Sequence, residues 1–470
     1  MFKKTDPNPQ LDIFTAPSMQ LGIRASKKYS DPNAWHNQFY SLVTTKIDEE
    51  IFKPLFPEGK KSGRPNASIR ILVAMSVLKE GFGCSDEDLF EKCEFDLLTR
   101  KALGMELLTD VTPSIDTYYL FRRRICEYQE RTGIDLMQLC FEQLAGKHVH
   151  LLKISGKCVR MDSKLIGSNI ARQSRYELIH TTLVKFLKTC TLTHLSPEQE
   201  ERAKEYLKED SSKTVYRSDS DTLQSNLARI GNFIMEMLAV FPATSPAHDL
   251  LLRLFDEQYV VMDGKAVLRD KKEVKADSLQ NPNDPDATYR AKNDQKVQGY
   301  VTNITETVEE GKPNIITSVQ VETAVFADCH FLQEAVENSE RVTDSTIEDL
   351  YADGAYQSPD NREFAKNHNA MQLKTGKMQG GCRWELIPHD EDGLTVREIA
   401  TGNTYEAVKA VTKQGSRKRW RIPWNNKTGW RYFEDKDIKA YQLRKQIESL
   451  PLEEQHKRNN VCLLYTSPSP

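Results

Sequence analysis

The sequence has no uninterrupted run of about 18 apolar residues, the length that a transmembrane helix needs, so no membrane span is expected. Its first residues, Met1 to Pro7, turn polar at once and lack the apolar core of a signal peptide. A charge excess of one sign is also missing, because 65 basic and 68 acidic side chains give a formal net charge of −3. A nucleic-acid partner would therefore be bound by local basic patches rather than by overall charge. These absences predict a cytoplasmic protein with no membrane partner.

Signatures of several cofactor-dependent classes are absent too. The nine cysteines include no CxxC pair and no zinc-binding spacing, which indicates reduced thiols in a cytosolic protein. The ten histidines form no HxxxH pair, and no phosphate-binding glycine loop precedes a predicted helix. An ATPase or a dehydrogenase is therefore unsupported.

The length of 470 residues and the composition predict a large globular protein. At about 150 residues per domain the length suggests two or three domains, and 39% hydrophobic with 28% charged residues is ordinary for a globular chain. Local composition predicts a flexible polar arm over residues 1–30, a helical domain over 31–150 and a mixed domain over 151–461.

The helical domain contains three predicted helices joined by tight turns. An apolar face at helical spacing predicts a helix over 67–82, and Ser85 is placed to cap a second helix over 86–103. A third helix, after Thr112-Pro113-Ser114, carries three successive basic residues, Arg122, Arg123 and Arg124. This pattern fits a helix-turn-helix-like DNA-binding module. A plain helical bundle with a solvated arginine face fits it as well.

The mixed domain alternates strands and helices in an order that favours one sheet. A strand ending at Met161 delivers Asp162. Two capping boxes, which begin at Ser174 and Ser196, and an apolar stripe predict a helical insertion over about 171–267. A hairpin over 296–324, a helix over 331–340, a strand delivering Asp353 and a helix from Pro359 follow. A β insertion over about 376–432 precedes a helix over 436–450. This order predicts an α/β fold with a ribonuclease-H-like mixed sheet.

Asp162 and Asp353 are the candidate catalytic and metal-ligating residues. If both strands lie centrally in one sheet, the two carboxylates meet at one edge and offer the hard oxygen ligands that Mg²⁺ prefers. Two such ions, roughly 4 Å apart, activate a water or a 3′-hydroxyl in phosphodiester chemistry. The alternative for either residue alone is an ordinary turn aspartate, and Asp353-Gly354 is a common turn pair.

The segment from Lys413 to Arg431 is basic and aromatic, with seven basic residues, no acidic ones and three tryptophans. Basic side chains neutralise phosphates and indole rings stack on exposed bases, so the segment predicts a nucleic-acid-binding surface. A charged hairpin face with packed tryptophans is equally consistent. The candidate residues are Lys413, Arg417, Lys418, Arg419, Arg421, Lys427 and Arg431, with Trp420, Trp424 and Trp430.

Five short segments occur in an order that is specific, although each is weak alone. They are Ser62–Pro65, Gly81–Asp86, Arg160–Ile166, Asp284–Tyr289 continuing to Gln298–Tyr300, and Tyr351–Tyr356. With them the chain resembles bacterial insertion-sequence transposases of the DDE type that have an InsH-like N-terminal domain. The resemblance spans about residues 40 to 461.

The resemblance implies a ribonuclease-H-like fold in which Asp162 and Asp353 ligate Mg²⁺ (or Mn²⁺). It implies that the N-terminal helices bind the ends of the element, and that water and a DNA 3′-hydroxyl are the nucleophiles of cleavage and joining. The implied partners are double-stranded DNA and further copies of the chain on that DNA. The implied location is the bacterial cytoplasm, with nucleoid association when DNA is bound.

One departure concerns the third acid of the family, a glutamate four residues after an arginine on a late helix. Arg458 puts that glutamate at position 462, where Cys462 stands. Residues 462–470 match the translation of a common sequencing-library adapter, so we expect a non-native tail and a truncated chain of low activity. Two alternatives stay open: a non-catalytic DNA-binding remnant of a transposase, and a ribonuclease-H-like nuclease without strand transfer.

Overall fold

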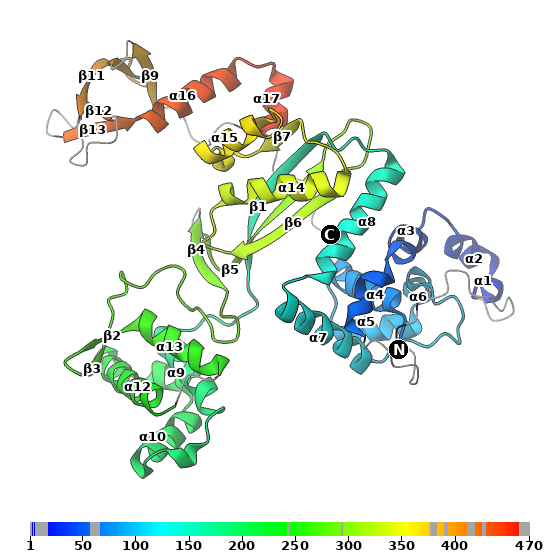
Figure 1. Cartoon of the computed structure of the whole chain (residues 1–470), viewed down its shortest axis with the longest axis horizontal. Coiled ribbons are helices and arrows are strands. Elements are labelled where there is room, and N and C mark those ends of the chain that lie inside the picture. Colours follow the sequence, from blue (N-terminus) through cyan, green and yellow to red (C-terminus); the bar gives the residue numbers. More distant parts are fainter. Residues whose placement is uncertain are drawn as a thin grey trace. The chain divides into compact units, whose positions relative to one another are not determined.

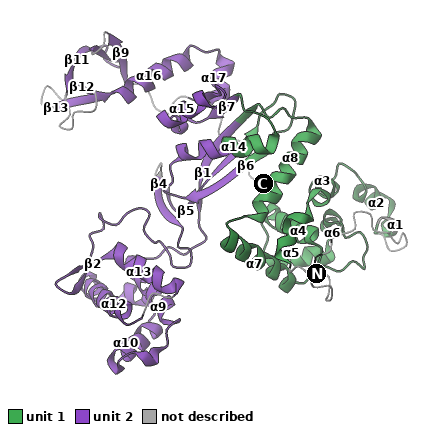
Figure 2. Ribbon diagram, viewed as in Figure 1, with its two compact units in different colours: residues 1–159, 306–318, 336–348 green, residues 160–305, 319–335, 349–470 purple. Residues whose placement is uncertain are grey.

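The computed structural model describes residues 2, 4, 17–56, 66–241, 245–292, 295–376, 383–389, 393–410, 419–424 and 429–459. Over these residues the chain is a mixed α/β structure with a helical N-terminal region and a mixed sheet (Figure 1). Two compact units divide it, as Figure 2 shows. Unit 1 comprises residues 1–159, 306–318 and 336–348, and unit 2 comprises 160–305, 319–335 and 349–470.

The N-terminal region of unit 1 is helical. Its α-helices are α1 (Pro17–Gln20), α2 (Ile23–Tyr29), α3 (Trp35–Leu42), α4 (Ile69–Phe82), α5 (Asp86–Phe95), α6 (Leu97–Leu103), α7 (Ile115–Thr132) and α8 (Leu136–Leu152), with short 3-10 helices η2 (Thr44–Lys46) and η3 (Glu49–Leu55). A core of buried side chains from these helices, including Phe52, Met75, Leu89 and Tyr118, holds them together. The burial of such large apolar groups is the main stabilising term for a helical bundle.

The helix boundaries follow local capping chemistry. The Ser68 hydroxyl accepts a hydrogen bond from Ile71 N at the start of α4, and Gly83 ends the helix in the left-handed conformation. Ser85 and Asp88 form the capping box of α5. The predicted helix over 86–103 is interrupted, because the Asp96 carboxylate caps a new helix, α6, by accepting from Leu98 N and Thr99 N.

The prediction of a flexible arm over residues 1–30 is wrong for its last part. Residues 23–29 form α2, and Tyr29 is buried. Its carbonyl accepts hydrogen bonds from His36 Nε2 (2.8 Å) and Asn37 Nδ2 (2.8 Å), so α2 is attached to α3. The earlier residues of the arm, apart from 2, 4 and 17–20, lie outside the described residues.

A six-stranded mixed sheet occupies the middle of the chain. Its strands are β1 (Cys158–Gly167), β4 (Thr288–Lys292), β5 (Gln295–Thr307), β6 (Ile316–Thr323), β7 (Asp349–Ala352) and β8 (Gln372–Thr375). The order is β4-β5-β1-β7-β8, and β6 also pairs with β5, so β1 lies at the centre. Residues of β1, β5 and β6 belong to both units.

The strand directions follow from the hydrogen bonds at the strand ends. Val308, just after β5, donates to the carbonyl of Cys158 at the start of β1, and Ser168, just after β1, donates to Gln298 in β5, so these strands are antiparallel. Glu348 and Lys157, the residues just before β7 and β1, are bonded to each other, so these two strands run parallel. The pair β7 and β8 is also parallel.

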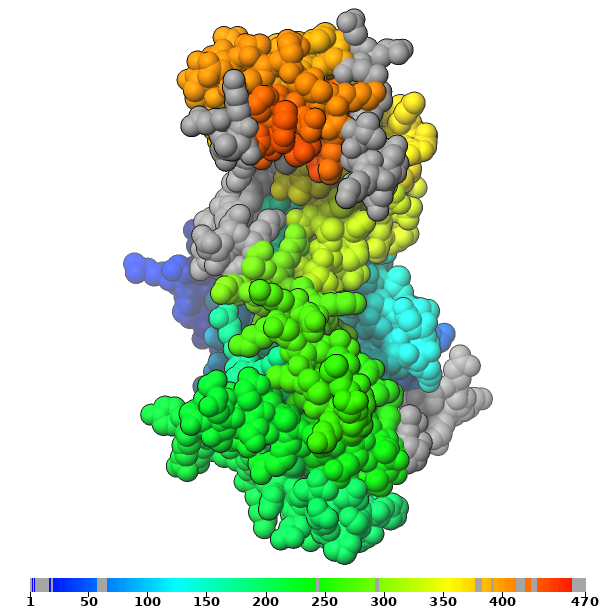
Figure 3. Space-filling model, turned by 90° about the vertical axis from the view of Figure 1, so that its left-hand side faces the viewer, coloured from blue at the N-terminus to red at the C-terminus, as the bar shows by residue number. Residues whose placement is uncertain are grey.

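A helical insertion separates β1 from β4 in the chain. It comprises α9 (Arg175–Leu187), η4 (Leu192–His194), α10 (Pro197–Lys208), α11 (Ser211–Arg217), α12 (Ser220–Val240) and α13 (Pro246–Gln258), followed by the hairpin β2 (Tyr259–Met262) and β3 (Lys265–Leu268). The capping boxes predicted at Ser174 and Ser196 are confirmed. Because the hairpin takes residues 259–268, the predicted insertion over 171–267 ends in strands rather than helix. Figure 3 shows this insertion in green.

The rest of unit 2 adds a second sheet and the last helices. The predicted β insertion contains a five-stranded antiparallel meander of β9 (Trp384–His389), β10 (Gly393–Glu398), β11 (Thr404–Ala410), β12 (Arg419–Trp424) and β13 (Gly429–Glu434). The remaining elements are η5 (Asp328–Phe331), α14 (Leu332–Thr343), η6 (Gly354–Tyr356), α15 (Pro359–Asn367), α16 (Asp435–Glu448) and α17 (Leu452–Asn459). The meander and α16 share a separate buried cluster around Trp420, Ile422 and Phe433.

Candidate active site

Asp162 lies within the central strand of the mixed sheet. Its side chain is 7% exposed, and its Oδ1 accepts a hydrogen bond from Ser163 N (2.9 Å). The prediction that Asp162 ends a strand is wrong, because β1 continues through Gly167, where it is still paired with β5. A carboxylate at this position is held by a strand that is paired on both edges.

Asp353 lies directly after β7, as predicted. It is the N-cap residue of η6, and its carboxylate accepts a hydrogen bond from Ala355 N. Its side chain is exposed. The cap fixes the backbone at the carboxyl end of the strand and leaves the carboxylate open to solvent.

The two aspartates lie at the same level of the sheet. Their strands, β1 and β7, are neighbours and run parallel, with Glu348 N bonded to Lys157 O just before the strands begin. Five residues further along each strand stand Asp162 and Asp353. Parallel neighbours are about 4.8 Å apart, so an equal count along both strands brings the two residues side by side.

A buried phenol lies close to both carboxylates. Tyr356, on η6, is fully buried and donates a hydrogen bond to Asn303 Oδ1 (2.7 Å). Burial raises the pKa of Tyr356 far above its usual range, and the negative charges of Asp328, Asp162 and Asp353 raise it further. The hydroxyl is therefore a neutral hydrogen-bond donor at any physiological pH. It connects η6 to β5 through Asn303.

Asp328 is not available as a further ligand. Its side chain is 5% exposed, and Oδ1 forms an ion pair with Arg290 Nη1 (3.1 Å). The same guanidinium nitrogen donates to the carbonyls of Ala324 and Phe326. This ion pair fastens the loop after β6 to β4. Neither Asp328 nor Asn303 had a sequence signal, whereas Tyr356 belongs to the segment Tyr351–Tyr356 that carries the resemblance.

The ligand chemistry of the pair suits Mg²⁺ in part. Mg²⁺ is bound by one or two carboxylates and keeps several waters or takes phosphate oxygens, which two adjacent aspartates at an open strand end allow. In the part of the chain that the structure describes, no group of three or more His, Cys, Asp or Glu side chains is arranged to hold a metal ion. Position 462, where the sequence predicts a third acid, lies outside the described residues.

Arg458 lies on α17 and pairs with Glu454 Oε1 (2.9 Å). The hydroxyl of Tyr351, on β7, donates to the other oxygen of Glu454 (3.4 Å). Burial alone would raise the pKa of Glu454, but hydrogen bonds and charges from Arg458, Lys374 and Tyr351 hold that pKa below its usual value. The arginine is thus attached through a carboxylate to the strand that delivers Asp353.

The three arginines of α7 point in different directions, because successive helix residues are about 100° apart. Arg122 is exposed, 3.9 Å from Asp86 and over the ring of Tyr118, and Arg123 is exposed and pairs with Glu127. Arg124 is half-buried over the ring of Phe56. Two of the three guanidinium groups are therefore available on the solvent side of α7.

The predicted basic and aromatic surface divides between the core and the solvent. The indole of Trp420 is 4% exposed in the cluster of the meander, so the prediction that it stacks on bases is wrong, because strand alternation turns it inward. Trp430 is 49% exposed, with the Arg421 guanidinium 4.2 Å from its ring centroid. Arg419 pairs with Glu434 (2.7 Å), and Arg431 is exposed. Lys413, Arg417, Lys418 and Lys427 lie outside the described residues, as does the side chain of Trp424.

Comparison with known proteins gives one match. Residues 28–124 match the model of a family described as transposase domain (DUF772), which supports a transposase family for this chain. The matched residues run from the end of α2 into α7. No curated protein and no solved structure matches the chain. Among the described residues, no helix combines the length and apolarity that crossing a membrane requires.

Proposed function

We propose that the protein is the transposase of an insertion sequence, of the DDE type with an InsH-like N-terminal domain. In this proposal it binds element ends and catalyses metal-dependent DNA cleavage and strand transfer. The observation that carries the proposal is the placement of Asp162 and Asp353 side by side on neighbouring parallel strands. The transposase-domain match over residues 28–124 supports it independently.

The sheet supports a ribonuclease-H-like fold. We number β1 as the first strand, β5 as the second, β4 and β6 together as the third, β7 as the fourth and β8 as the fifth. Across the sheet these strands lie in the order third, second, first, fourth, fifth. The second strand is antiparallel to the first strand, whereas the fourth and fifth strands are parallel to the first strand. Such a sheet presents the first and fourth strands together at its centre, which is where the two aspartates stand. Fold alone does not define a function, so the proposal depends on the carboxylate pair.

Asp162 and Asp353 would hold the Mg²⁺ (or Mn²⁺). When bound, the metal supplies positive charge that lowers the pKa of a nucleophilic water or 3′-hydroxyl and stabilises the leaving oxygen. The chain's own contribution is positioning: β1 holds Asp162 rigidly, the η6 cap orients Asp353, and Tyr356 locks η6 against Asn303. Arg458 steadies the late helix through Glu454.

DNA contacts belong to two surfaces in this proposal. The exposed Arg122 and Arg123 of α7 would contact the phosphates of double-stranded element ends. Trp430, Arg421 and Arg431 of the meander offer an exposed ring with positive charge beside it, which suits an unpaired or distorted strand. Further copies of the chain on the same DNA and a bacterial cytoplasmic location complete the proposal.

The test compares DNA processing by matched variants. The chain carrying Cys462→Glu, which restores the predicted third acid, is incubated with Mg²⁺ and a plasmid bearing the gene with its flanking DNA. We expect this chain to nick and join DNA. Adding Asp162→Asn or Asp353→Asn should lower both activities by more than about 10–100-fold, which is the loss typical of removing an outer-shell partner. Asp360→Asn is the control, since it is the same change on the exposed first turn of α15.

Other outcomes separate the alternatives. Cleavage that depends on both aspartates but never yields joined strands would identify a nuclease without strand transfer. DNA binding with no cleavage by any variant would indicate a non-catalytic remnant. Cleavage that survives both asparagine substitutions would overturn the assignment of the site.

A further inference from the structure

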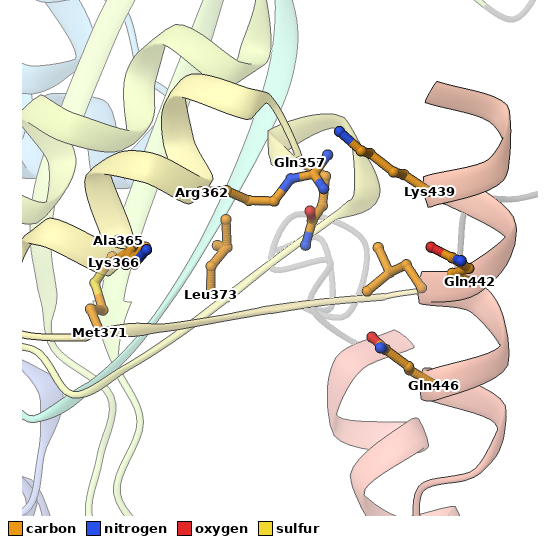
Figure 4. A pocket seen from close by; sticks show the side chains of 10 residues that line it. Gln357, Arg362, Ala365, Lys366, Met371, Leu373, Lys439, Gln442 and Gln446 are labelled. Atoms are coloured by element: carbon orange, nitrogen blue, oxygen red, sulfur yellow. The ribbon is translucent and has the colours of Figure 1, made fainter. Parts of the chain in front are cut away.

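A polar cavity of about 390 Å³ lies between α15, β8 and α16, within unit 2 (Figure 4). Arg362 and Lys366 line it from α15, one helical turn apart, and Lys439 lines it from α16. Its volume falls in the range of small-ligand sites, about 300–1,000 Å³. Gln357 lines the cavity directly after η6, the 3-10 helix that Asp353 caps, but the proposed function does not use the cavity.

The side chains that line this cavity carry positive charge and no negative charge. It contains three cationic side chains and no acidic one. Each of Arg362, Lys366 and Lys439 is exposed, and no ion pair joins any of them to another described residue. Neighbouring like charges repel, so a bound anion would be stabilised by all three cations.

Amide side chains also line the cavity. Gln357 donates through Nε2 to Thr375 Oγ1 (2.9 Å), while its Oε1 is buried without a hydrogen-bond partner among the described residues. Because that oxygen is buried, a ligand in the cavity does not reach it in this structure, and Gln357 serves as a wall that is fixed to β8 through Thr375. Met371, Leu373 and Leu443 add an apolar surface, and Gln442 and Gln446 add further amides.

We propose that this cavity binds one nucleotide unit. The phosphate would lie between Lys439 and the α15 cations, the base would form hydrogen bonds with the amides of Gln442 and Gln446, and the base or sugar would cover the apolar residues. Inorganic anions lack the base and its apolar face, and apolar ligands lack the charge. The nucleotide could be part of a DNA strand or a free nucleotide, which share this chemistry. The DNA source rests on the proposed function, whereas binding itself does not.

Lysine footprinting of the full chain tests the proposal at the site itself. Exposed lysines are acetylated with and without ligand and quantified by mass spectrometry, with a short single-stranded oligonucleotide, deoxyadenosine monophosphate and inorganic phosphate as separate probes. We expect Lys366 and Lys439 to be protected, while Lys436 and Lys445 on the same helix as Lys439 stay reactive. Protection by both nucleotide probes identifies a free-nucleotide site, and protection by the oligonucleotide alone identifies a strand site.

Matched variants complete the test. Arg362→Gln with Gln446→Leu should raise the probe concentration needed for half-protection of Lys439 by about tenfold, since two contacts to the nucleotide are lost. Lys445→Gln, a charge change on α16 outside the cavity, should leave it unchanged. Unprotected Lys439 with every probe, or equal protection by inorganic phosphate, would overturn the proposal. Protection that persists in Asp162→Asn, whatever that variant's cleavage activity, separates this site from the proposed function.

Discussion

At the scale of single residues, the pair Asp162 and Asp353 was predictable from sequence, and its surroundings were not. Each aspartate stands in a motif beside a strand-like segment, which indicated its place in the sheet, although β1 continues past Asp162 to Gly167. Tyr356, Asn303 and Asp328 are at least 25 positions apart in the chain (328 − 303), and only the folded sheet brings them together. Trp420 shows the opposite error: a tryptophan in a basic run looked like a stacking residue, but strand alternation buries it.

Because of its buried tyrosines, the folded chain should lose stability at alkaline pH. Burial raises the pKa of Tyr29 from 10.0 to about 12, and the pKa values of the buried Tyr259 and Tyr356 are raised further. In the unfolded chain these phenols lose their protons near pH 10, whereas in the folded chain they keep them. Their contribution to folding is therefore complete below about pH 10 and is lost as the pH rises through the folded pKa values.

We accordingly expect the urea midpoint to fall between about pH 9 and about pH 11. Near-ultraviolet absorbance should show a further rise in tyrosinate as the chain unfolds, beyond the rise that the exposed tyrosines give in the folded chain. The variant Tyr356→Phe should show a shallower fall, because one of these phenols is removed. A midpoint that does not change over this range would contradict the raised pKa values.

At the scale of elements, close packing between β1 and β5 explains a glycine in one of the recognised segments. A Cβ added to Gly299 would lie 2.2 Å from Ile166 O and 2.5 Å from Ser168 N, both backbone atoms that cannot move without breaking the strand pairing. Gln298 O accepts from Ser168 N at the same place. The glycine therefore permits the approach that pairs β5 with the strand carrying Asp162.

Gly299→Ala should lower the free energy of unfolding by about 1–3 kcal/mol, the cost typical of overpacking, and should impair any activity that needs Asp162. Gly167→Ala is the matched control, because its Cβ would meet nothing within 4 Å. Chemical denaturation of both variants measures the difference. Equal stability of the two would show that β5 can shift at no cost.

The boundary between α5 and α6 shows why helix ends were harder to predict than helices. The apolar pattern continues through residues 86–103, but Asp96 accepts from two backbone N–H groups of the next turn and starts a second helix. Asp96→Ala should therefore cost about 1 kcal/mol, as for other N-caps. Asp116→Ala, in the first turn of α7 but not its cap, should cost less. Thermal denaturation followed by circular dichroism compares them, and an equal loss would contradict the capping role.

At the scale of the whole molecule, the chain builds several hydrophobic cores rather than one. The insertion has its own cluster, including Phe233, Ile234 and Tyr259, and the N-terminal helices and the meander each have another. The sequence predicted these segments from changes in periodicity. It did not predict the sheet order, because pairing between strands far apart in the chain leaves no local pattern.

Separate cores should unfold in separate steps. Calorimetry of the full chain should show more than one transition, since independent cores do not melt as one cooperative unit. Phe233→Ala, which leaves a cavity at a fully buried site in the insertion, should lower the free energy of unfolding of one transition by about 3–5 kcal/mol. The other transitions should keep their temperatures. Phe95→Ala, an exposed site, should change none of them. A single transition that shifts as a whole would show that the cores are coupled.

The distance along the chain between the two aspartates has a consequence for the timing of synthesis. From residue 162 to residue 353 the ribosome must add 191 residues (353 − 162), which takes about 10–40 s at about 5–20 residues per second. During that time β1 has emerged without β7, while the helical insertion can fold on its own core. A nascent chain therefore cannot hold a metal between the two strands until most of the protein has been made. The long separation of the two aspartates in the chain therefore delays the assembly of the proposed DNA-cleaving site until well after translation has started.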